Sequence, residues 1–488
     1  MESTSFAERT RQFWAWFTEN EERISGIAQD RGASSEEREQ AVEFISEGVA
    51  LLSEDLYFNI GGEHEFTFSV NANDAMFFLL PYVTANLPEQ FREKWSFSPC
   101  MQGTGGENFK FGMHGVNVDT DSVMVAVSPD EAGRTADILF YAEEWDALDE
   151  NDCYSAFYIL MELTIGEALA NMCIGEVQKA DAPVKGMFPL TNLEQWMLGN
   201  LCEDGEVPDP AMQHFTYRRE PEEDEDGQSL RQDIFVGIAN YIPILSGYDS
   251  GEDECYQSFV SFGAKPVFLY YYYDGGSEAD RQGALDWRND TMDMLEEQAL
   301  GQRGSGQETG LLLGGAMGEY RAYIDLLLYD EPEFLEKARA LLKDSPNMIF
   351  VKEFCPDGRE FLLTDEDVPG FADRLGQLVN CGAFAEIVKI LEAMPPEKLD
   401  YEMNSILSRA LNNIDEYQRA LDIMETIRCR GESDPAWHYR RGYSLWYLDR
   451  EAEAEAALLR AKELAKEGDP VLGYADELLE MIEEWKNE

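Results

Sequence analysis

Histidine, paired cysteine and positive charge are all scarce in this chain of 488 residues. The four histidines lie far apart and outside any HExxH arrangement: His64, His114, His214 and His438. A zinc site needs three or four ligands brought together, and a nucleophilic side chain needs a base beside it. No Gly-x-Ser-x-Gly elbow is present, and no cysteine stands close to a histidine. The sequence therefore predicts no metal, no cofactor and no catalytic residue.

The cysteines and apolar stretches give no sign of export or of a membrane anchor. The eight cysteines are scattered and form no CxxC pair, so a disulfide framework is not expected in a chain this long. Residues 1–23 carry charges throughout and lack the apolar segment of a signal peptide. The longest apolar stretches, Ala75–Leu80 and Pro266–Tyr273, are much shorter than a membrane span. We therefore expect a cytoplasmic protein in a reducing compartment, with no membrane contact.

Positive charge is scarce relative to negative charge, because 97 Asp and Glu stand against 38 Lys and Arg, a formal net charge of −59. Nucleic acids and anionic membrane surfaces are bound by clusters of Lys and Arg, and the sequence contains no run of them. We expect neither as a partner. The acidity has three interpretations: a solvated surface, which we favour, a mimic of nucleic acid that masks a basic protein, and adaptation to high salt.

Length and composition indicate several well-packed domains. The apolar content of 44% is ordinary, and 12% aromatic residues favour filled cores over disorder. A chain of this length exceeds one hydrophobic core, so about two to four domains are expected. We predict a multidomain α+β fold, with two mixed α/β sheet domains at residues 1–215 and 216–369, followed by an all-helical repeat domain at residues 370–488.

The first predicted domain alternates between helices and strands. Helical spacing of apolar residues runs through residues 6–54, with a helix start at Ser34–Glu37. Gly61-Gly62 separates two strand-like runs and predicts a hairpin. The further elements that we expect are a helix at 74–87, strands at 95–98, 122–127 and 136–142, and a long helix at 152–170.

A tyrosine-rich strand characterises the second predicted domain. Residues 265–273 are strongly β-forming and end in four tyrosines, Tyr270–Tyr273. Alternation places one pair on each face of the strand. We expect one pair in the core, and the other pair either in the core or exposed to a partner. Strands at 308–313 and 320–328 flank Gly314-Gly315. With helices at 280–300 and 331–342 and a hairpin at 348–363, the order β-α-β-β-α-β predicts a ferredoxin-like sheet.

Four segments are rich in glycine or acid, and three of them invite a functional interpretation. Gly103–Gly106 and Gly310–Gly318 could cradle a phosphate, but the second lacks a following Lys, and we favour a tight strand connection or bulge there. The cluster Glu143–Asp152 could hold Mg²⁺ or Ca²⁺ or supply an acid and a base, although an acidic chain produces such clusters by composition. Glu220–Gly227, with six acids in eight residues, is predicted to be a domain boundary or a solvated loop.

The most regular pattern is a repeat near the C-terminus. Leu407, Leu411, Ala420, Met424 and Ile427 recur 34 residues later as Arg441, Leu445, Ala454, Leu458 and Ala461. This period resembles the tetratricopeptide repeat, which places small residues at the positions of Gly442 and Ala454 so that paired helices approach closely. Arg441 departs from the family, which has Leu there. The resemblance implies stacked helix pairs and a capping helix at 471–485.

Two further resemblances concern the rest of the chain. Residues 311–320, with Tyr323-Ile324-Asp325, are similar to a module of uncharacterised bacterial proteins. The N-terminal half, through Gly166-Glu167, is similar to another such α/β domain. These resemblances imply a bacterial origin and no activity.

The groove of the helical array is the best candidate for a binding site. In the family that it resembles, the first helix of each pair lines the concave face, which here implies Arg409, Asn412, Tyr439, Arg440, Tyr443 and Trp446. An Arg with neighbouring aromatic residues suits an acidic peptide or a C-terminal carboxylate. Alternatively, these residues only pack the repeats together or pair with nearby acids.

We therefore expect a non-enzymatic scaffold or adaptor that binds a protein through this groove. The alternative is an acidic inhibitor or immunity-type protein that masks a basic partner such as a nuclease, in a complex that salt weakens steeply. A third hypothesis is an enzyme that uses the carboxylates of Glu143–Asp152, and it requires those carboxylates to converge in a pocket.

Overall fold

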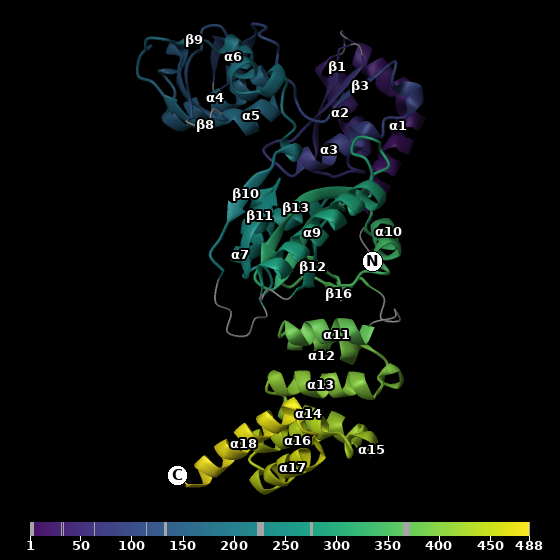
Figure 1. Ribbon diagram of the computed structural model, residues 1–488. Helices are drawn as coiled ribbons and strands as arrows, with labels where there is room; N and C mark the ends of the chain where they lie inside the picture. Colours follow the sequence, from purple (N-terminus) through teal and green to yellow (C-terminus); the bar gives the residue numbers. More distant parts are fainter. Residues whose placement is uncertain are drawn as a thin grey trace.

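The computed structural model describes residues 4–30, 32, 34–62, 64–113, 115–130, 134–221, 229–273, 277–364 and 371–487. Two sheet-containing parts lie side by side at the N-terminal end, a larger sheet lies below them, and the C-terminal helices extend from it as a column (Figure 1). The prediction of several mixed α/β parts followed by a helical part is confirmed. Within the described residues, no helix is both long enough and apolar enough to cross a membrane.

Three helices and a three-stranded sheet form the first part, and each of these elements was predicted. Ser34 caps the second helix, because its Oγ accepts from the Glu37 amide and its own amide donates to the Glu37 carboxylate at 2.8 Å. The hairpin across Gly61-Gly62 is present, and the third strand pairs in parallel with the second strand of this hairpin. The elements are α1 (Phe6–Gln29), α2 (Ser35–Val49), β1 (Tyr57–Gly61), β2 (Glu65–Ser69), α3 (Met76–Ala85) and β3 (Ser96–Ser98).

A four-stranded sheet of order β8-β7-β6-β9 forms the second part. Its buried apolar residues form a cluster of their own, whereas those of the first hundred residues belong to the cluster of the larger sheet. The expected long helix is interrupted at Gly166, and the hairpin β4-β5 was not predicted. The elements are β4 (Lys110–Met113), β5 (Val116–Asp119), β6 (Met124–Pro129), β7 (Ala136–Tyr141), α4 (Glu150–Ile165), α5 (Glu167–Cys173), β8 (Ile174–Lys179), β9 (Phe188–Pro189) and α6 (Leu193–Asn200).

The larger sheet has seven antiparallel strands in the order β10-β11-β13-β14-β12-β15-β16. Its centre runs β12-α9-β13-β14-α10-β15 along the chain, which is the connectivity that we expected, and β10, β11 and β16 extend it. The elements are β10 (Phe215–Arg218), β11 (Ile234–Ala239), α7 (Ile242–Ser250), α8 (Glu254–Val260), β12 (Lys265–Tyr272), α9 (Glu278–Leu295), β13 (Gly310–Gly318), β14 (Arg321–Leu328), α10 (Glu331–Leu342), β15 (Phe350–Glu353) and β16 (Glu360–Leu362).

One expectation for this sheet is wrong, and one question that the sequence left open is answered. Gly314-Gly315 lies inside β13 and not between two strands; the alternative of a bulge is correct, since the register shifts between Leu312 and Gly314. Gly314 has φ of +138°, and a Cβ there would lie 2.1 Å from the Ile238 carbonyl oxygen, so only glycine fits. The tyrosines Tyr270–Tyr273 are all buried, because both faces of β12 are covered, so they form no exposed patch.

Short contacts join the first part to the larger sheet. The amides of Phe6 and Ala7 donate to the carbonyls of Gly263 and Tyr329, each at 3.0 Å. The Tyr329 hydroxyl donates to the Phe78 carbonyl at 2.5 Å. The predicted acidic linker, Glu220–Gly227, lies outside the described residues from position 222 onward.

The C-terminal part is helical throughout its described residues, and each of the helices that periodicity predicted is present. Each long helix packs on the next, and α13 also contacts α16, which in turn contacts α18. The elements are α11 (Phe371–Asn380), α12 (Phe384–Ala393), α13 (Tyr401–Asn413), α14 (Tyr417–Thr426), α15 (Arg428–Gly431), α16 (Pro435–Tyr447), α17 (Glu451–Leu464) and α18 (Pro470–Asn487). We call α11–α18 the helical array.

Gly442 lies at a close approach of α16 and α17. A Cβ at this position would lie 2.8 Å from Cγ of Leu458 and 3.3 Å from the Ala454 carbonyl oxygen. We expect Gly442→Ala to lower the free energy of unfolding by about 1–3 kcal/mol, because the added methyl overpacks the contact. Gly473→Ala is the matched control: its Cβ would meet no atom within 4 Å, and we expect a gain of about 0.5–1 kcal/mol. Urea denaturation followed by circular dichroism measures both, and equal gains would contradict the close approach.

Candidate functional site

Five tyrosines gather on one side of the helical array. Tyr439, Tyr443 and Tyr447 follow one another at four-residue spacing, so they share one face of α16. The Tyr443 and Tyr447 rings lie 4.8 Å apart, and Tyr439 lies 6.4 Å from Tyr443. Tyr417 of α14 stacks on Tyr447 at 4.8 Å and 9°, and Tyr474 of α18 lies 5.8 Å from Tyr439. We call these five residues the tyrosine cluster.

The tyrosine cluster is open to solvent at its two ends. Tyr447 is 44% exposed and Tyr474 is 53% exposed, while the other three are half-buried. Burial raises the pKa of Tyr439 and Tyr443, so these phenols stay neutral at neutral pH. A surface of neutral phenols offers apolar rings together with hydroxyl groups for hydrogen bonds, the combination that interfaces favour.

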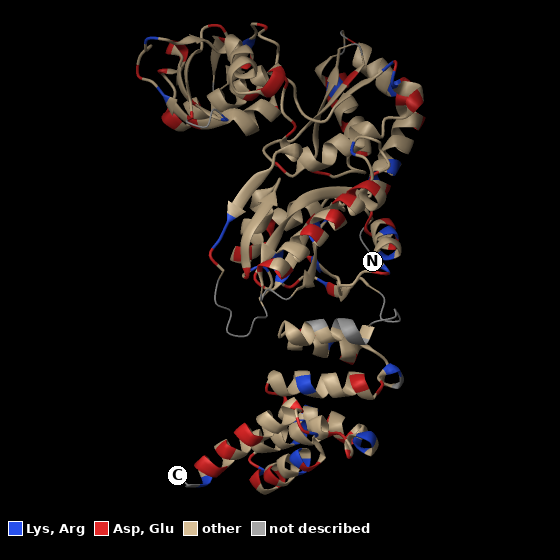
Figure 2. Ribbon diagram, in the orientation of Figure 1, with Lys and Arg blue, Asp and Glu red and all other residues tan. Residues whose placement is uncertain are grey.

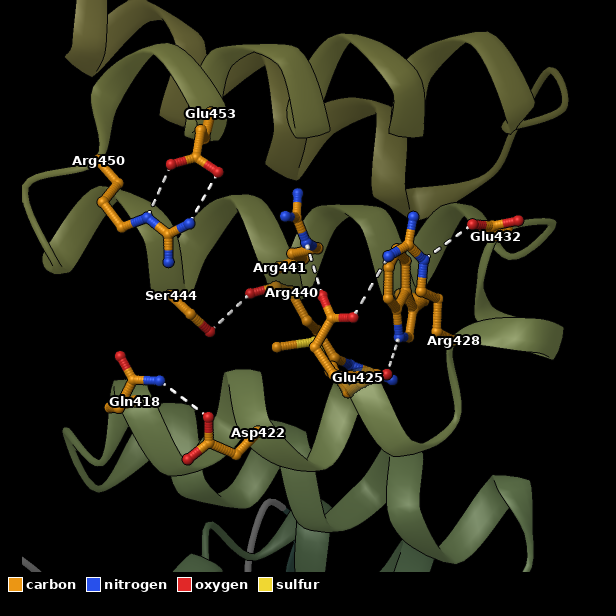
Figure 3. Close-up of polar contacts among 12 residues, drawn as sticks. Gln418, Asp422, Glu425, Arg428, Glu432, Arg440, Arg441, Ser444, Arg450 and Glu453 are labelled. Carbon is orange, nitrogen blue, oxygen red and sulfur yellow. Dashed lines mark hydrogen bonds and ion pairs between the residues drawn. The ribbon is translucent and has the colours of Figure 1, made fainter.

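Arg409 of α13 lies beside this cluster with its charge unpaired. It is exposed and close enough to Tyr439 to oppose the rise that burial causes in the pKa of that phenol. Its guanidinium forms no ion pair with any described residue. Neighbouring arginines of the array differ, because Arg441 contacts Glu425, Arg428 contacts Glu425 and Glu432, and Arg450 binds Glu453 (Figure 3). Arg409 therefore has its full hydrogen-bonding capacity left for a partner.

The other three residues that were predicted to line the groove, Asn412, Arg440 and Trp446, lie outside the tyrosine cluster. Trp446 is half-buried and meets Trp485 edge-on, with ring centres 5.7 Å apart. Arg440 is half-buried, burial lowers its pKa, and it donates to the Ser405 hydroxyl. Asn412 is only 4% exposed; it donates to the Arg440 carbonyl at 3.1 Å and accepts from the Ser444 hydroxyl at 2.7 Å. Asn412 thus lies beneath the surface and joins α13 to α16.

Three members of the tyrosine cluster, Tyr417, Tyr447 and Tyr474, were not predicted from the sequence to belong to the binding surface. Tyr447 had a readable signal, since it lies four residues after Tyr443 on the same helix face. Tyr417 and Tyr474 belong to other helices, and only the packing of α14 and α18 against α16 brings them to this face. Their positions in the sequence carried no signal for it.

The acidic cluster at Glu143–Asp152 does not converge on a pocket. Glu143, Glu144, Asp146 and Glu150 are exposed, and Asp146 lies 3.8 Å from Lys179. Asp149 caps α4, because its carboxylate accepts from the Asp152 amide at 2.9 Å. Among the described residues, no group of three or more His, Cys, Asp or Glu is arranged to hold a metal ion.

The glycines Gly103–Gly106 surround a carboxylate. The Gly105 amide donates to Glu194 at 2.9 Å, and a Cβ on Gly103 would lie 2.7 Å from the same carboxylate. A phosphate at these amides would meet the negative charge of Glu194, so the arrangement does not favour an anion.

A buried charge network inside the larger sheet had no sequence signal. Arg231 and Asp325 are each about 1% exposed, and the guanidinium binds both carboxylate oxygens, at 2.6 and 3.1 Å. The Tyr323 hydroxyl accepts from the Arg231 amide at 3.0 Å and donates to Asp233 at 2.5 Å. All these groups are bonded to one another, which indicates a structural role.

Comparison with known proteins adds no further constraint on the site. Protein-family models, curated proteins and solved structures give no match to this chain. The tyrosine cluster and Arg409 are therefore interpreted from the geometry of this chain and from general chemistry.

Proposed function

We propose that this protein is a non-enzymatic binding protein that holds a partner polypeptide on the tyrosine cluster and Arg409. The observation that carries the proposal is a group of five contacting tyrosine rings, with an exposed, unpaired guanidinium on α13 within electrostatic reach of one of them, Tyr439. Tyr and Arg are the residues that most often dominate binding energy at protein interfaces.

The architecture of the helical array supports a tetratricopeptide-type groove. The 34-residue register, the close approach at Gly442 and the contacts of α13 with α16 and of α16 with α18 all fit stacked helix pairs. In such an array the first helices of successive pairs face one side, and α13 and α16 carry Arg409 and the central tyrosines. Repeats of this kind present an extended surface to a partner.

The chemistry of the surface favours an extended peptide with an acidic side chain or a C-terminal carboxylate. A guanidinium binds a carboxylate through two parallel hydrogen bonds, and the tyrosine rings can cover an adjacent apolar side chain. The half-buried rings cost little conformational entropy on binding, because their neighbours already hold them.

Panning the full-length protein against a displayed library of random and C-terminal peptides tests the proposal. We expect enriched peptides to carry an acid or a free C-terminus beside an apolar residue. Arg409→Ala should weaken their binding about 10-fold, and Tyr447→Ala with Tyr474→Ala should weaken it by 10-fold or more, roughly 1.4 kcal/mol for each factor of ten. Both tyrosines are exposed, so these changes spare the core.

Arg460→Ala is the matched control, because Arg460 is an exposed arginine of the array that is paired with Glu463 at 2.7 Å. Its removal should leave peptide binding unchanged. Equal binding by the Arg409 and Arg460 variants would refute the proposal. Enrichment of Lys- and Arg-rich peptides, with binding that falls steeply as salt rises, would instead favour the inhibitor of a basic partner.

A further inference from the structure

A groove of about 940 Å³ lies between the larger sheet and the helical array. Its walls come from three elements: α10 on one side, the edge strand β16 along the floor, and α12 on the other side. Its lining carries three cations, two carboxylates and several apolar side chains: Arg339, Lys343 and Lys389; Glu360 and Glu386; and Phe361, Leu362 and Ile390 among the apolar ones. This groove is separate from the tyrosine cluster, which lies on α14, α16 and α18.

The floor of the groove is the open edge of the seven-stranded sheet. β16 is the last strand, paired on one side only with β15. The Leu363 amide donates to the Ile349 carbonyl, and the Glu353 amide donates to the Arg359 carbonyl. The backbone amides and carbonyls of the odd-numbered residues of this strand therefore point toward β15. Along a strand of an antiparallel pair, the backbone groups of successive residues point alternately toward the partner strand and away from it. The amides and carbonyls of Glu360 and Leu362 therefore face the open edge. They have no hydrogen-bond partner among the described residues.

Unpaired positive charge surrounds this edge. Arg339 and Lys343 are exposed and form no ion pair with a described residue, in a chain that has only 38 cations. Lys389 lies 3.7 Å from Glu360, whose carboxylate also accepts from the buried Tyr270 hydroxyl at 2.6 Å. Figure 2 shows that α10 carries Lys and Arg together with Glu. The lining thus has three cations against two carboxylates, Glu360 and the buried Glu386, in a protein of net charge −59.

We propose that this groove binds an extended peptide with acidic side chains, which adds to the sheet as a strand beside β16. Strand addition satisfies the free amides and carbonyls of Glu360 and Leu362. Successive side chains of such a peptide point to opposite faces. One set meets Arg339, Lys343 and the Phe361 ring on the α10 side, and the other set meets Lys389 and Ile390 on the α12 side. A peptide that alternates acidic and apolar residues presents its acids to Arg339 and Lys343 on the α10 side and its apolar residues to Ile390 on the α12 side.

The direct test uses short synthetic peptides and the full-length protein. The probe is an acetylated, fluorescent decapeptide of alternating Glu and Val, and its counterpart has Lys in place of Glu. At about 0.15 M salt the long-range attraction between a net charge of −59 and the Lys peptide is screened. Arg339 and Lys343 of the groove attract the Glu peptide and repel the Lys peptide. We therefore expect the Glu peptide to bind with measurable affinity by fluorescence anisotropy and the Lys peptide to bind at least 10-fold more weakly. No binding of the Glu peptide, or a preference for the Lys peptide, would overturn the proposal.

Charge reversal on α10 locates the binding site. Lys343→Glu should weaken binding of the Glu peptide at least 10-fold, because it replaces an attractive contact by a repulsive one. Lys337→Glu is the matched control, since Lys337 belongs to the same helix, is paired with Glu333 at 2.8 Å and does not line the groove. Arg409→Ala, on the tyrosine cluster, should have no effect here. Loss of binding in the Arg409 variant alone would assign the peptide to the surface of the proposed function and overturn this inference.

N-methylated peptides test the strand pairing without any change to the protein. Methyl groups on every second backbone nitrogen block the hydrogen bonds of one strand edge and leave the other edge free. We expect one of the two methylation registers to abolish binding and the other to preserve it, because a strand added to β16 uses one edge only. Equal affinities for the two registers would show that the peptide does not pair with β16.

Discussion

Asp325→Ala should lower the free energy of unfolding by about 3–5 kcal/mol, the cost of leaving a buried charge without its partner. Asp325 and Arg231 are each about 1% exposed, and they are joined by two hydrogen bonds across the face of the larger sheet. The Phe268, Tyr323 and Phe354 rings lie 5.1, 5.2 and 4.9 Å from the guanidinium. These rings leave no water to take over the solvation of Arg231 once the carboxylate is removed.

The double variant Arg231→Met with Asp325→Leu separates the charge effect from loss of packing. Replacement of a buried ion pair by apolar side chains of similar volume is close to neutral, so we expect most of the stability to return. Urea denaturation measures the loss, and hydrogen exchange of the β12 and β14 amides shows where it occurs. A single variant as stable as the native protein would mean that the guanidinium finds another acceptor. A double variant as unstable as Asp325→Ala would mean that the loss of stability comes from altered packing and not from the unpaired charge.

Glu167→Ala should lower the free energy of unfolding by about 3 kcal/mol and loosen the second part of the molecule from the first. Glu167 is only 4% exposed. Its carboxylate accepts from the Ser69 hydroxyl at 2.5 Å and from the amides of Met101 at 2.8 Å, Val70 at 3.2 Å and Asn71 at 3.3 Å. Loss of the carboxylate leaves buried donors unsatisfied, at about 1–3 kcal/mol for each.

Glu162→Ala provides the control for the Glu167 variant. Glu162 is half-buried on the neighbouring helix, its side chain accepts no hydrogen bond from a described residue, and burial raises its pKa. Its removal should change the free energy of unfolding by less than about 0.5 kcal/mol. Hydrogen exchange at Val70 and Met101 and limited proteolysis near residue 101 report the loosening. Unchanged exchange at both amides in the Glu167 variant would contradict the role of Glu167 as a bridge.

Local patterns in the sequence predicted most helices and several strands. The helices of the array follow from apolar residues at helical spacing, and α2 follows from Ser34 and Glu37, which cap it within four residues of each other. Such interactions join neighbours along the chain, so they can be read without knowledge of the fold. The same patterns failed at Gly314, where a local turn signal stands inside a strand because the neighbouring strand β11 approaches closely.

The tyrosine cluster was predictable only in part, because some of its contacts lie within one helix and others join different helices. Tyr439 and Tyr443 belong to one helix and were expected on its exposed face, whereas Asn412, expected beside them, is covered by α16. Helical periodicity shows which residues share a face, but not how deeply the next helix buries it. The free charge of Arg409 is likewise a tertiary property, since it depends on which acids the fold brings near.

The sequence by itself determined the acidic surface, the succession of α/β and helical parts, and the close-packed helix pair at Gly442, because composition and short-range periodicity are properties of the chain. Only the tertiary structure decided which charges are buried together and which surfaces stay open. Asp325 meets Arg231 across 94 positions and Glu167 meets Ser69 across 98. The open edge of β16 exists because no described strand pairs with it. These contacts join residues far apart in the chain, and no local pattern specifies such a pairing.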